Sequence, residues 1–326
     1  MKSLLHILAL AMGITLVACT GNYKIDVKFA NHDFDGKKAY LTNYDTGDTI
    51  DSAVVEKEQF SFKGTTEGSF MARLLGGPHR IDFVVEGGAL VIDTLGNVTG
   101  TPLNEQLNAI SDSLDKIEEE EVAANYFHDI YEKNRDNGLG LWALSLYTMY
   151  AAPSASQIDS MLATAPEQVK QSKRMAKLIA SAKAKDVTAV GQPFADFAVA
   201  DSTGAEQRLS DYVGKGKWAI VDFWASWCGP CRREMPNLKE LYGRFGQKAN
   251  FLGVAVWDEP ADTRVAIKQL ELPWPVIVGT KRLTEPTDIY GIDGIPHIII
   301  FDPQGKVAAR GLQGEELAKK VEELLK

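Results

Sequence analysis

The chain has 326 residues, of which 45% are hydrophobic and 24% are charged, an ordinary globular composition with room for two or three domains. Its formal net charge is −9. A nucleic-acid partner is therefore not expected, because no surplus of basic residues is present to neutralise phosphates.

Residues 1–18 have the pattern of a signal peptide: a lysine, the apolar run SLLHILALAMGITLVA, and then Cys19. The residues Leu16–Cys19 (LVAC) resemble the lipobox of bacterial lipoproteins. That resemblance implies a mature chain that begins at a lipid-modified Cys19 and is held to a membrane of the cell envelope. A plain secretory signal with a chance cysteine is the alternative. Both interpretations place the protein outside the cytoplasm.

Residues 19–101 have the pattern of a small β domain. The segments YKIDVKF, KKAYLTNY, DSAVVEKEQFSFKG and RIDFVVEGGALVID alternate apolar with polar residues or are rich in β-branched residues. We expect an antiparallel sandwich or barrel. The features DGKKAYL, VVEGGALVID and VTGTPLN resemble a β domain of unclear role found in Bacteroidetes-type lipoproteins. His32 and His79 stand without evident partners and are expected to be structural.

Residues 102–186 predict a helical connector. LNEQLNAISDSLDKIEEEEVAANYFHDIYEKN has helical spacing as far as the Asn-Gly pair at 137–138, with a solvated acidic run at Glu118–Glu121. GLGLWALSLYTMYAA is too short to span a membrane and predicts a buried helix. Ser156 and Thr164 are expected to cap the helices that follow. No catalytic constellation is visible in this segment.

Residues 187–326 alternate between strands and helices. FADFAVAD and TGAEQRL predict a hairpin, and WAIVDFWA and ANFLGVAVW are apolar runs typical of a sheet covered on both faces. CRREMPNLKELYGRFG, TRVAIKQLEL and GEELAKKVEELL have helical spacing, and HIIIFDPQGKVAAR predicts two strands about a turn. This order predicts a compact α/β domain with a mixed sheet.

The chain has three cysteines, Cys19, Cys228 and Cys231. With Cys19 assigned to lipid, the other two form a CxxC pair in an exported protein. A structural disulfide here would close a very short loop and stabilise the fold little. A zinc site is disfavoured, because it needs about four ligands and neither a second CxxC nor paired histidines are present. A redox-active pair is the interpretation that remains.

The redox motif is accompanied by three further elements in a fixed order. Asp222 stands six residues before the WCGPC cysteine pair, Pro236 five residues after it, and Pro296 opens the run PHIIIF. With these elements, residues 190–326 resemble thioredoxin, and more particularly the exported thioredoxin-like proteins of the TlpA/ResA group. The resemblance implies an α/β thioredoxin fold and a cis peptide bond before Pro296.

The place of Cys228 between a buried strand and a helix predicts its role. Unpaired N–H groups and the dipole at a helix N-terminus favour a thiolate, which attacks disulfides. Cys231, one turn later, is expected to resolve the mixed disulfide. Asp222 is expected to accept the proton of Cys231, its pKa raised by burial, with a purely structural aspartate as the alternative. The lysine that partners this carboxylate in thioredoxin is not matched, and Trp257-Asp258 occupies its region.

Substrate contacts are expected on both sides of the cysteine pair. Trp227, Gly229 and Pro230 belong to the motif itself, and Ile295 precedes the cis-proline, where its backbone would pair with an extended substrate segment. His297 follows the proline and either tunes the site or only packs. No metal and no cofactor besides the redox-active disulfide are expected.

The expected function is that of a thiol:disulfide oxidoreductase that reduces exported proteins in the envelope. The TlpA/ResA resemblance implies substrates such as apocytochrome c or other thiol proteins, and a membrane electron donor of the DsbD/CcdA type. A disulfide oxidase or isomerase is the nearest alternative. A thiol peroxidase is disfavoured, because Ala225 and Val221 stand where peroxiredoxins have Thr or Ser and Pro. In a non-enzymatic alternative, the β domain binds a partner and the redox module is subordinate.

Overall fold

The computed structural model describes residues 20–326 apart from 31, 79 and 115. The described chain divides into two compact units, the first running through Ala151 and including Ala165–Arg174, and the second comprising Ala152–Thr164 and Met175–Lys326. The expected signal peptide, the lipidated Cys19 and His79 lie outside the described residues. Within residues 20–326, leaving those gaps aside, no helix has the length and apolarity needed to cross a membrane.

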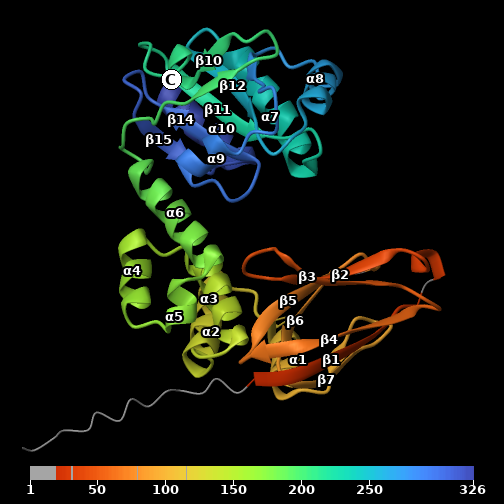
Figure 1. Cartoon of the computed structure of the whole chain (residues 1–326). Coiled ribbons are helices and arrows are strands. Elements are labelled where there is room, and N and C mark those ends of the chain that lie inside the picture. The colour runs from red at the N-terminus through yellow and green to blue at the C-terminus, as the bar shows by residue number, and fades with distance from the viewer. Residues whose placement is uncertain (1–19, 31, 79, 115) are drawn as a thin grey trace, which may run out of the picture. The chain divides into compact units, whose positions relative to one another are not determined.

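The first unit opens with a sandwich of two four-stranded sheets (Figure 1). One sheet has the order β4 (Gln59–Glu67), β1 (Thr20–Lys28), β7 (Gly88–Ile92), β8 (Val98–Thr99). The other has the order β3 (Thr49–Val54), β2 (Lys38–Asn43), β5 (Phe70–Leu75), β6 (Ile81–Val85). Inward side chains of both sheets form one core, which includes Ile25, Leu41, Phe62, Leu74, Phe83 and Leu90.

The sandwich differs from the expected all-antiparallel arrangement in one pairing. β1 and β7 run parallel, with Ile25 beside Leu90. β1 is the first strand of its sheet and pairs with β4 on its other side, so the chain reaches β7 only after building the second sheet. The alternation of side chains along a strand is the same whether its neighbour is parallel or antiparallel. The sequence pattern therefore does not reveal that β1 and β7 are parallel.

Helices complete the first unit: α1 (Pro102–Leu114), α2 (Glu120–Lys133), α3 (Gly138–Ala151) and the short α5 (Glu167–Lys170). The prediction of one continuous helix up to the 137–138 pair is wrong, since α1 ends at Leu114 and α2 begins at Glu120. The acidic run thus occupies the start of α2, where carboxylates favour the positive end of the helix dipole.

The second unit contains α4 (Ala155–Ala163), the greater part of α6 (Lys173–Val187) and the α/β domain. The two expected caps are wrong. Ser154, not Ser156, caps α4 through a reciprocal pair of hydrogen bonds with Gln157, and Thr164 ends α4 instead of starting a helix. The predicted hairpin is present as β9 (Ala198–Ala200) and β10 (Glu206–Arg208).

The α/β domain is built on a five-stranded sheet of order β13 (Val276–Ile277), β12 (Ala249–Ala255), β11 (Trp218–Trp224), β14 (His297–Phe301), β15 (Val307–Arg310). Central β11 runs parallel to β12 and antiparallel to β14. The helices of this domain are α7 (Gly229–Phe245), α8 (Pro260–Gln269), α9 (Glu285–Tyr290) and α10 (Gly314–Leu325), with a short 3-10 turn at Leu209–Asp211; a second 3-10 turn, His32–Phe34, belongs to the first unit. The expected fold class, a thioredoxin-like α/β domain after a β domain and a helical segment, is confirmed.

The sheet has a separate apolar core on each face. Ile220 and Trp224 of β11 contribute to the core that also contains Leu238 of α7 and Leu317 of α10. Val221 and its odd-numbered neighbours contribute to the core on the other face. Because side chains alternate along a strand, Asp222 falls on the face that α7 covers.

Candidate active site

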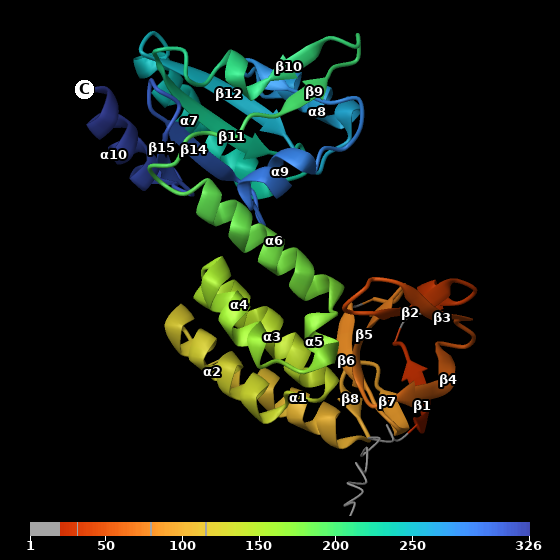
Figure 2. The ribbon, with the colours of Figure 1, turned by 60° about the vertical axis from the view of Figure 1, so that its left-hand side comes forward.

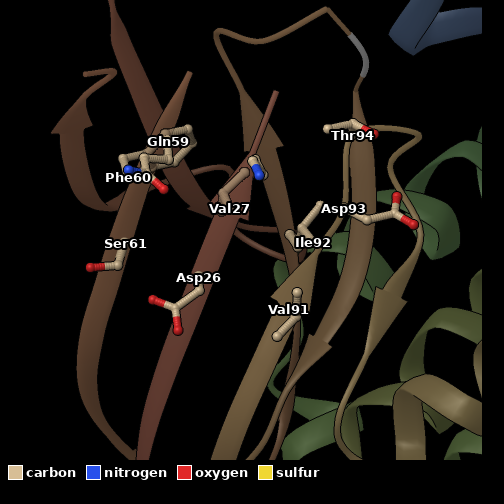
Figure 3. Close-up of a pocket in the computed structure, with 10 residues that line it drawn as sticks. Asp26, Val27, Gln59, Phe60, Ser61, Val91, Ile92, Asp93 and Thr94 are labelled. Carbon is tan, nitrogen blue, oxygen red and sulfur yellow. The ribbon is translucent and has the colours of Figure 1, made fainter. Parts of the chain in front are cut away.

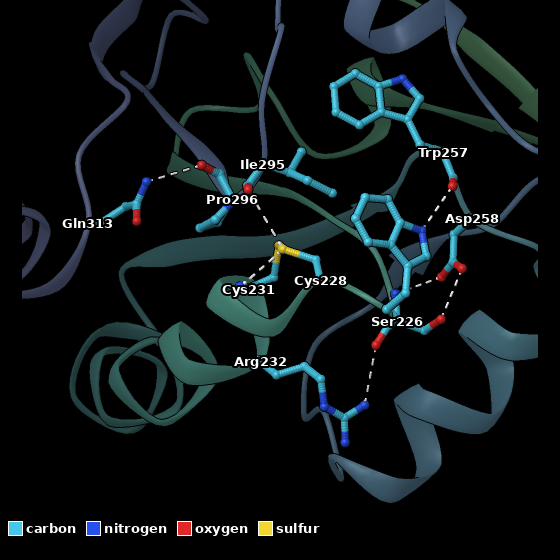
Figure 4. The surroundings of a disulfide bond; sticks show 10 residues. Ser226, Cys228, Cys231, Arg232, Trp257, Asp258, Ile295, Pro296 and Gln313 are labelled. Atoms are coloured by element: carbon cyan, nitrogen blue, oxygen red, sulfur yellow. Dashed lines mark hydrogen bonds between the residues drawn. A yellow bond between two sulfur atoms is a disulfide. The ribbon is translucent and has the colours of Figure 1, made fainter. Parts of the chain in front are cut away.

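Cys228 and Cys231 form a disulfide at the N-terminus of α7, with their Cα atoms 5.3 Å apart (Figure 4). Cys228 is the N-cap residue, and its sulfur accepts a hydrogen bond of 3.1 Å from the backbone N–H of Cys231. Gly229 and Pro230 make up the first turn, where proline loses no helical hydrogen bond. Cys228 is only 3% exposed and Cys231 is fully buried, so an incoming partner meets Cys228 first.

The loop before β14 lies directly against Cys228. The peptide bond between Ile295 and Pro296 is cis, and the Ile295 carbonyl oxygen is 3.7 Å from the sulfur of Cys228. Gln313 holds the other side of this turn by donating a hydrogen bond of 3.2 Å to the Pro296 carbonyl. The backbone of Ile295, just before the cis-proline, therefore lies beside the disulfide (Figure 4).

Trp227 is a strongly exposed residue of the site, with 61% of its surface accessible. Its indole N–H donates a hydrogen bond of 3.0 Å to the carbonyl of Trp257, a residue whose backbone has a φ of 56°. The carboxylate of Asp258 accepts from the backbone N–H of Ser226 at 2.7 Å, from the Ser226 hydroxyl at 2.9 Å, and from the Thr263 hydroxyl at 2.7 Å. The pair Trp257-Asp258 thus holds the loop that leads into Cys228.

Asp222 lies beneath the site, 4% exposed, on the α7 side of the sheet. Burial, reinforced by the neighbouring carboxylate of Glu234, raises the pKa of Asp222 from 3.8 to about 8. Its Oδ1 has no hydrogen-bond partner among the described residues, an exceptional state for a buried polar atom. Burial thus brings the pKa of Asp222 close to neutral pH, the range in which a carboxyl group is suited to proton transfer.

Glu234 is the residue that the sequence analysis missed. It stands one turn after Cys231 on α7 and is 9% exposed. Its carboxylate accepts from the backbone N–H of Gly314 at 3.1 Å and from the Asn237 side chain at 2.6 Å. A signal was present in the sequence: three residues after Cys231, Glu234 is an acidic residue on the buried face of an otherwise amphipathic helix.

His297 is partly buried beside Arg310, its Nε2 lying 3.3 Å from a guanidinium nitrogen. Burial and then the charge of Arg310 lower the pKa of His297 to about 4. The imidazole is therefore neutral at pH 7, and it belongs to the packing between β14 and β15 more than to the rim of the disulfide. No three His, Cys, Asp or Glu side chains of the described residues are grouped as metal ligands would be.

The β sandwich carries a cavity of about 610 Å³, open to solvent and lined by residues of β1, β4 and β7 (Figure 3). Asp26, Ser61 and Val91 point toward it. Asp93 at its end is engaged in its own turn, accepting from Asn97 at 2.8 Å. The cavity contains no catalytic arrangement, so the chemistry of the described chain is concentrated at the cysteine pair.

A disulfide at a helix N-terminus, a buried carboxyl group beneath it and a cis-proline opposite it define a thioredoxin-fold protein with a dithiol–disulfide centre. Residues 190–310 match the model of the AhpC/TSA family, and residues 23–107 match a domain of unknown function, DUF4369. The thiol-disulfide oxidoreductase ResA of Geobacillus thermodenitrificans is 35% identical over 124 residues, covering 38% of this chain and 69% of that protein. The chain belongs to this family of ResA-type thiol-disulfide oxidoreductases.

Other relatives agree with this assignment. ResA of Bacillus thuringiensis is 34% identical over 142 residues, which cover 42% of this chain and 77% of the relative. Among solved structures, the thioredoxin domain of a thiol-disulfide oxidoreductase from Bacteroides vulgatus is 33% identical, with a TM-score of 0.39, covering 42% of this chain and 99% of that one. The identity to the ResA proteins, over more than two thirds of their length, gives the chain the activity of a thiol-disulfide oxidoreductase.

Proposed function

We propose that the protein reduces disulfide bonds of exported proteins in the cell envelope, with Cys228 as the nucleophile. The observation that carries the proposal is the position of Cys228 at the N-cap of α7, where the Cys231 N–H donates to its sulfur. A sulfur in this place is stabilised as a thiolate by the N–H group and the helix dipole. The neighbouring WCGPC sequence is that of thioredoxin, a strong reductant.

The proposed reaction transfers two electrons from the dithiol form of the enzyme. The Cys228 thiolate attacks one substrate sulfur, forming a mixed disulfide and releasing the other substrate sulfur as a thiolate. The ionised form of Asp222 takes the proton of Cys231, and the new thiolate attacks Cys228, which regenerates the disulfide and frees the reduced substrate. A thiol reductant must then return two electrons to the pair.

The substrate is proposed to bind at the rim of the disulfide. The backbone at Ile295 and Pro296 would pair with an extended segment, as an added strand does. Trp227, Gly229 and Pro230 would contact its other side. The exposed indole of Trp227 offers an apolar surface for this purpose.

The setting of the reaction follows from the expected leader sequence. Anchoring through a lipid on Cys19 would hold the protein at the envelope membrane, facing the periplasm. The proposed substrates are proteins of the apocytochrome c type or other exported thiol proteins. The proposed electron donor is a membrane protein of the DsbD/CcdA type.

Replacement of the nucleophile tests the proposal. With dithiothreitol as reductant, the chain should reduce insulin disulfides, and Cys228→Ser should abolish the reaction because the remaining thiol, Cys231, is fully buried and cannot reach a substrate. Cys231→Ser is the matched control: it should form mixed disulfides that accumulate, since the resolving thiol is missing. Full insulin reduction by Cys228→Ser would contradict the proposal. Equilibration with glutathione gives the direction, since a potential near about −120 mV would make the protein an oxidant.

A further inference from the structure

A second cavity lies close to the redox centre, within the second unit. It has a volume of about 520 Å³, and its walls come from α6, from α9, from the loop Gly291–Asp293 and from Trp257. Lys177, Ala180 and Ser181 line the α6 side. Helix α6 precedes the segment 190–310 that matches the family model, so this wall lies outside the matched segment.

Helix α6 is docked on the α/β domain beside α9 (Figure 2). The Asp293 carboxylate accepts from the Ser181 hydroxyl at 2.9 Å and from the Lys185 ammonium at 2.7 Å. Gly291 approaches α6 so closely that a side chain there would meet the Ser181 carbonyl. Helix α6 is therefore held against the loop Gly291–Asp293 by close backbone packing as well as by polar contacts.

Partly buried Arg310 fixes the C-terminal end of the same helix. Its guanidinium donates to the Thr188 carbonyl at 3.1 Å and to the Thr188 hydroxyl at 2.9 Å, directly after α6 ends. It also donates to the Tyr290 carbonyl at 2.7 Å, at the end of α9. A cation at the C-termini of two helices stabilises both helix ends. Arg310 thus binds the C-terminal ends of both helices that enclose the cavity.

Two chain segments lead from the cavity to the cysteine pair. Asp293 is two residues ahead of Ile295, whose carbonyl faces the sulfur of Cys228. On the other side, the carbonyl of Trp257 binds the indole of Trp227, the neighbour of Cys228 (Figure 4). The cavity is therefore connected through Asp293 and Trp257 to the two chain segments that contact Cys228 and Trp227.

The lining is chemically mixed. Lys177 on α6 supplies a cation and Asp288 on α9 supplies an anion. Hydroxyl groups of the lining can form hydrogen bonds, and Ala180, Ile292 and the Trp257 indole supply apolar surface. Such a lining suits a polypeptide, which carries backbone amides and varied side chains, better than a small ligand of one charge. The volume of about 520 Å³ lies within the range of pre-formed binding sites.

We propose that the polypeptide segment flanking the reactive cysteine of the substrate binds in the cavity between α6 and α9, so that α6 is a specificity element of the redox site. This inference rests on the proposed reduction of protein disulfides. It predicts that changes in the cavity affect polypeptide substrates and leave small disulfides, which need only reach Cys228, unaffected.

Ala180→Trp tests the inference because a large side chain on α6 would fill part of the cavity. We expect kcat/KM for insulin to fall by about tenfold, the factor that corresponds to 1.4 kcal/mol. The rate with 5,5′-dithiobis(2-nitrobenzoate), a small aromatic disulfide that needs only to reach Cys228, should stay within about twofold of the unmodified chain. A twofold change corresponds to well under about 1 kcal/mol. Ala163→Trp, an exposed position at the end of α4 outside the cavity, is the matched control and should leave both rates unchanged.

Lys177→Glu provides a second test that does not depend on filling the cavity, because Lys177 is exposed and its replacement leaves the packing of α6 intact. With two disulfide-bonded peptides that carry Glu or Lys beside the cysteine, the preference should shift toward the Lys peptide. An unchanged preference, together with equal effects of Ala180→Trp on insulin and on the small disulfide, would overturn the inference. Loss of exchange with every disulfide in the unmodified chain would instead overturn the proposed function.

Discussion

Two buried carboxyl groups, Asp222 and Glu234, lie beneath the disulfide and differ in their surroundings. Glu234 accepts hydrogen bonds from Gly314 and Asn237. Asp222 has an Oδ1 without a partner among the described residues, and burial raises its pKa to about 8. At neutral pH Asp222 is therefore mostly protonated, because burial raises its pKa.

The raised pKa of Asp222 makes a prediction about stability. Below about pH 4 the carboxyl is protonated in both the folded and the unfolded protein, whereas between pH 4 and about 8 it is ionised only when unfolded, so stability is lost as the pH rises. Asp222→Asn removes this loss and should raise the free energy of unfolding of the oxidised protein at pH 7 by roughly 2–4 kcal/mol. Urea unfolding at pH 4 and pH 7 measures the difference.

Asp288→Asn, which replaces an exposed carboxyl on α9, is the control and should keep the pH dependence of the unmodified chain, because Asp222 is still present. The same Asp222→Asn variant should slow the resolution of the mixed disulfide by about 100-fold, because Cys231 loses its proton acceptor. Greater stability with slower turnover is the expected combination for a strained catalytic group. If Asp222→Asn changes the free energy of unfolding by the same amount at pH 4 and at pH 7, Asp222 does not titrate in this range.

At the scale of the elements, the contact between α6 and the loop after α9 depends on one glycine. Gly291 ends α9 with a φ of 60°, in the left-handed region that favours glycine, and an added Cβ would meet backbone and side-chain atoms of α6. Helix α6 and α9 therefore pack with almost no space between their backbones at this position.

Gly291→Ala should lower the free energy of unfolding of the second unit by roughly 1–3 kcal/mol, combining left-handed strain with displacement of α6. Gly294→Ala in the same loop is the matched control, since its backbone has no positive φ and no atom lies within 4 Å of an added Cβ. Thermal unfolding of the two variants compares them directly. Equal stability of both would mean that α6 is not packed against Gly291.

The elements also show where sequence patterns succeed. The β9–β10 hairpin, the strands of the central sheet and α7 follow from the sequence, because a strand buried on both faces is a continuous apolar run and a helix buried on one face has helical spacing. The break between α1 and α2 and the cap at Ser154 were mispredicted. Both depend on which of several similar polar residues makes a local hydrogen bond, and spacing alone does not decide that.

At the scale of the whole molecule, the two units have separate apolar cores. Phe83 belongs to the core of the sandwich, and Trp224 to one of the two cores of the α/β sheet. The boundary between the units passes through the helical segment 102–186, since α1–α3 belong to the first unit and α4 and most of α6 to the second. Residues predicted as one connector are thus divided between two bodies.

We predict at least two calorimetric transitions for the oxidised chain, because each unit has a core of its own. Phe83→Ala, which leaves a cavity in the sandwich, should lower one transition by an amount that corresponds to about 3–5 kcal/mol. Asp222→Asn should raise the other transition and leave the first unchanged. A single transition that moves with either substitution would show that the units unfold as one.

The sequence by itself determined the redox chemistry of this protein: the CxxC pair, the aspartate before it and the proline opposite it carry fixed spacings, and the chain folds them together through strands and helices whose periodicity is visible. The tertiary structure alone decided which distant residues complete the site. Glu234 lies near Asp222, the Trp257 carbonyl binds the Trp227 indole, and α6 lines the second cavity. Each of these contacts joins residues that lie on different elements or loops of the chain. Such contacts depend on how elements pack, which leaves no local pattern in the sequence.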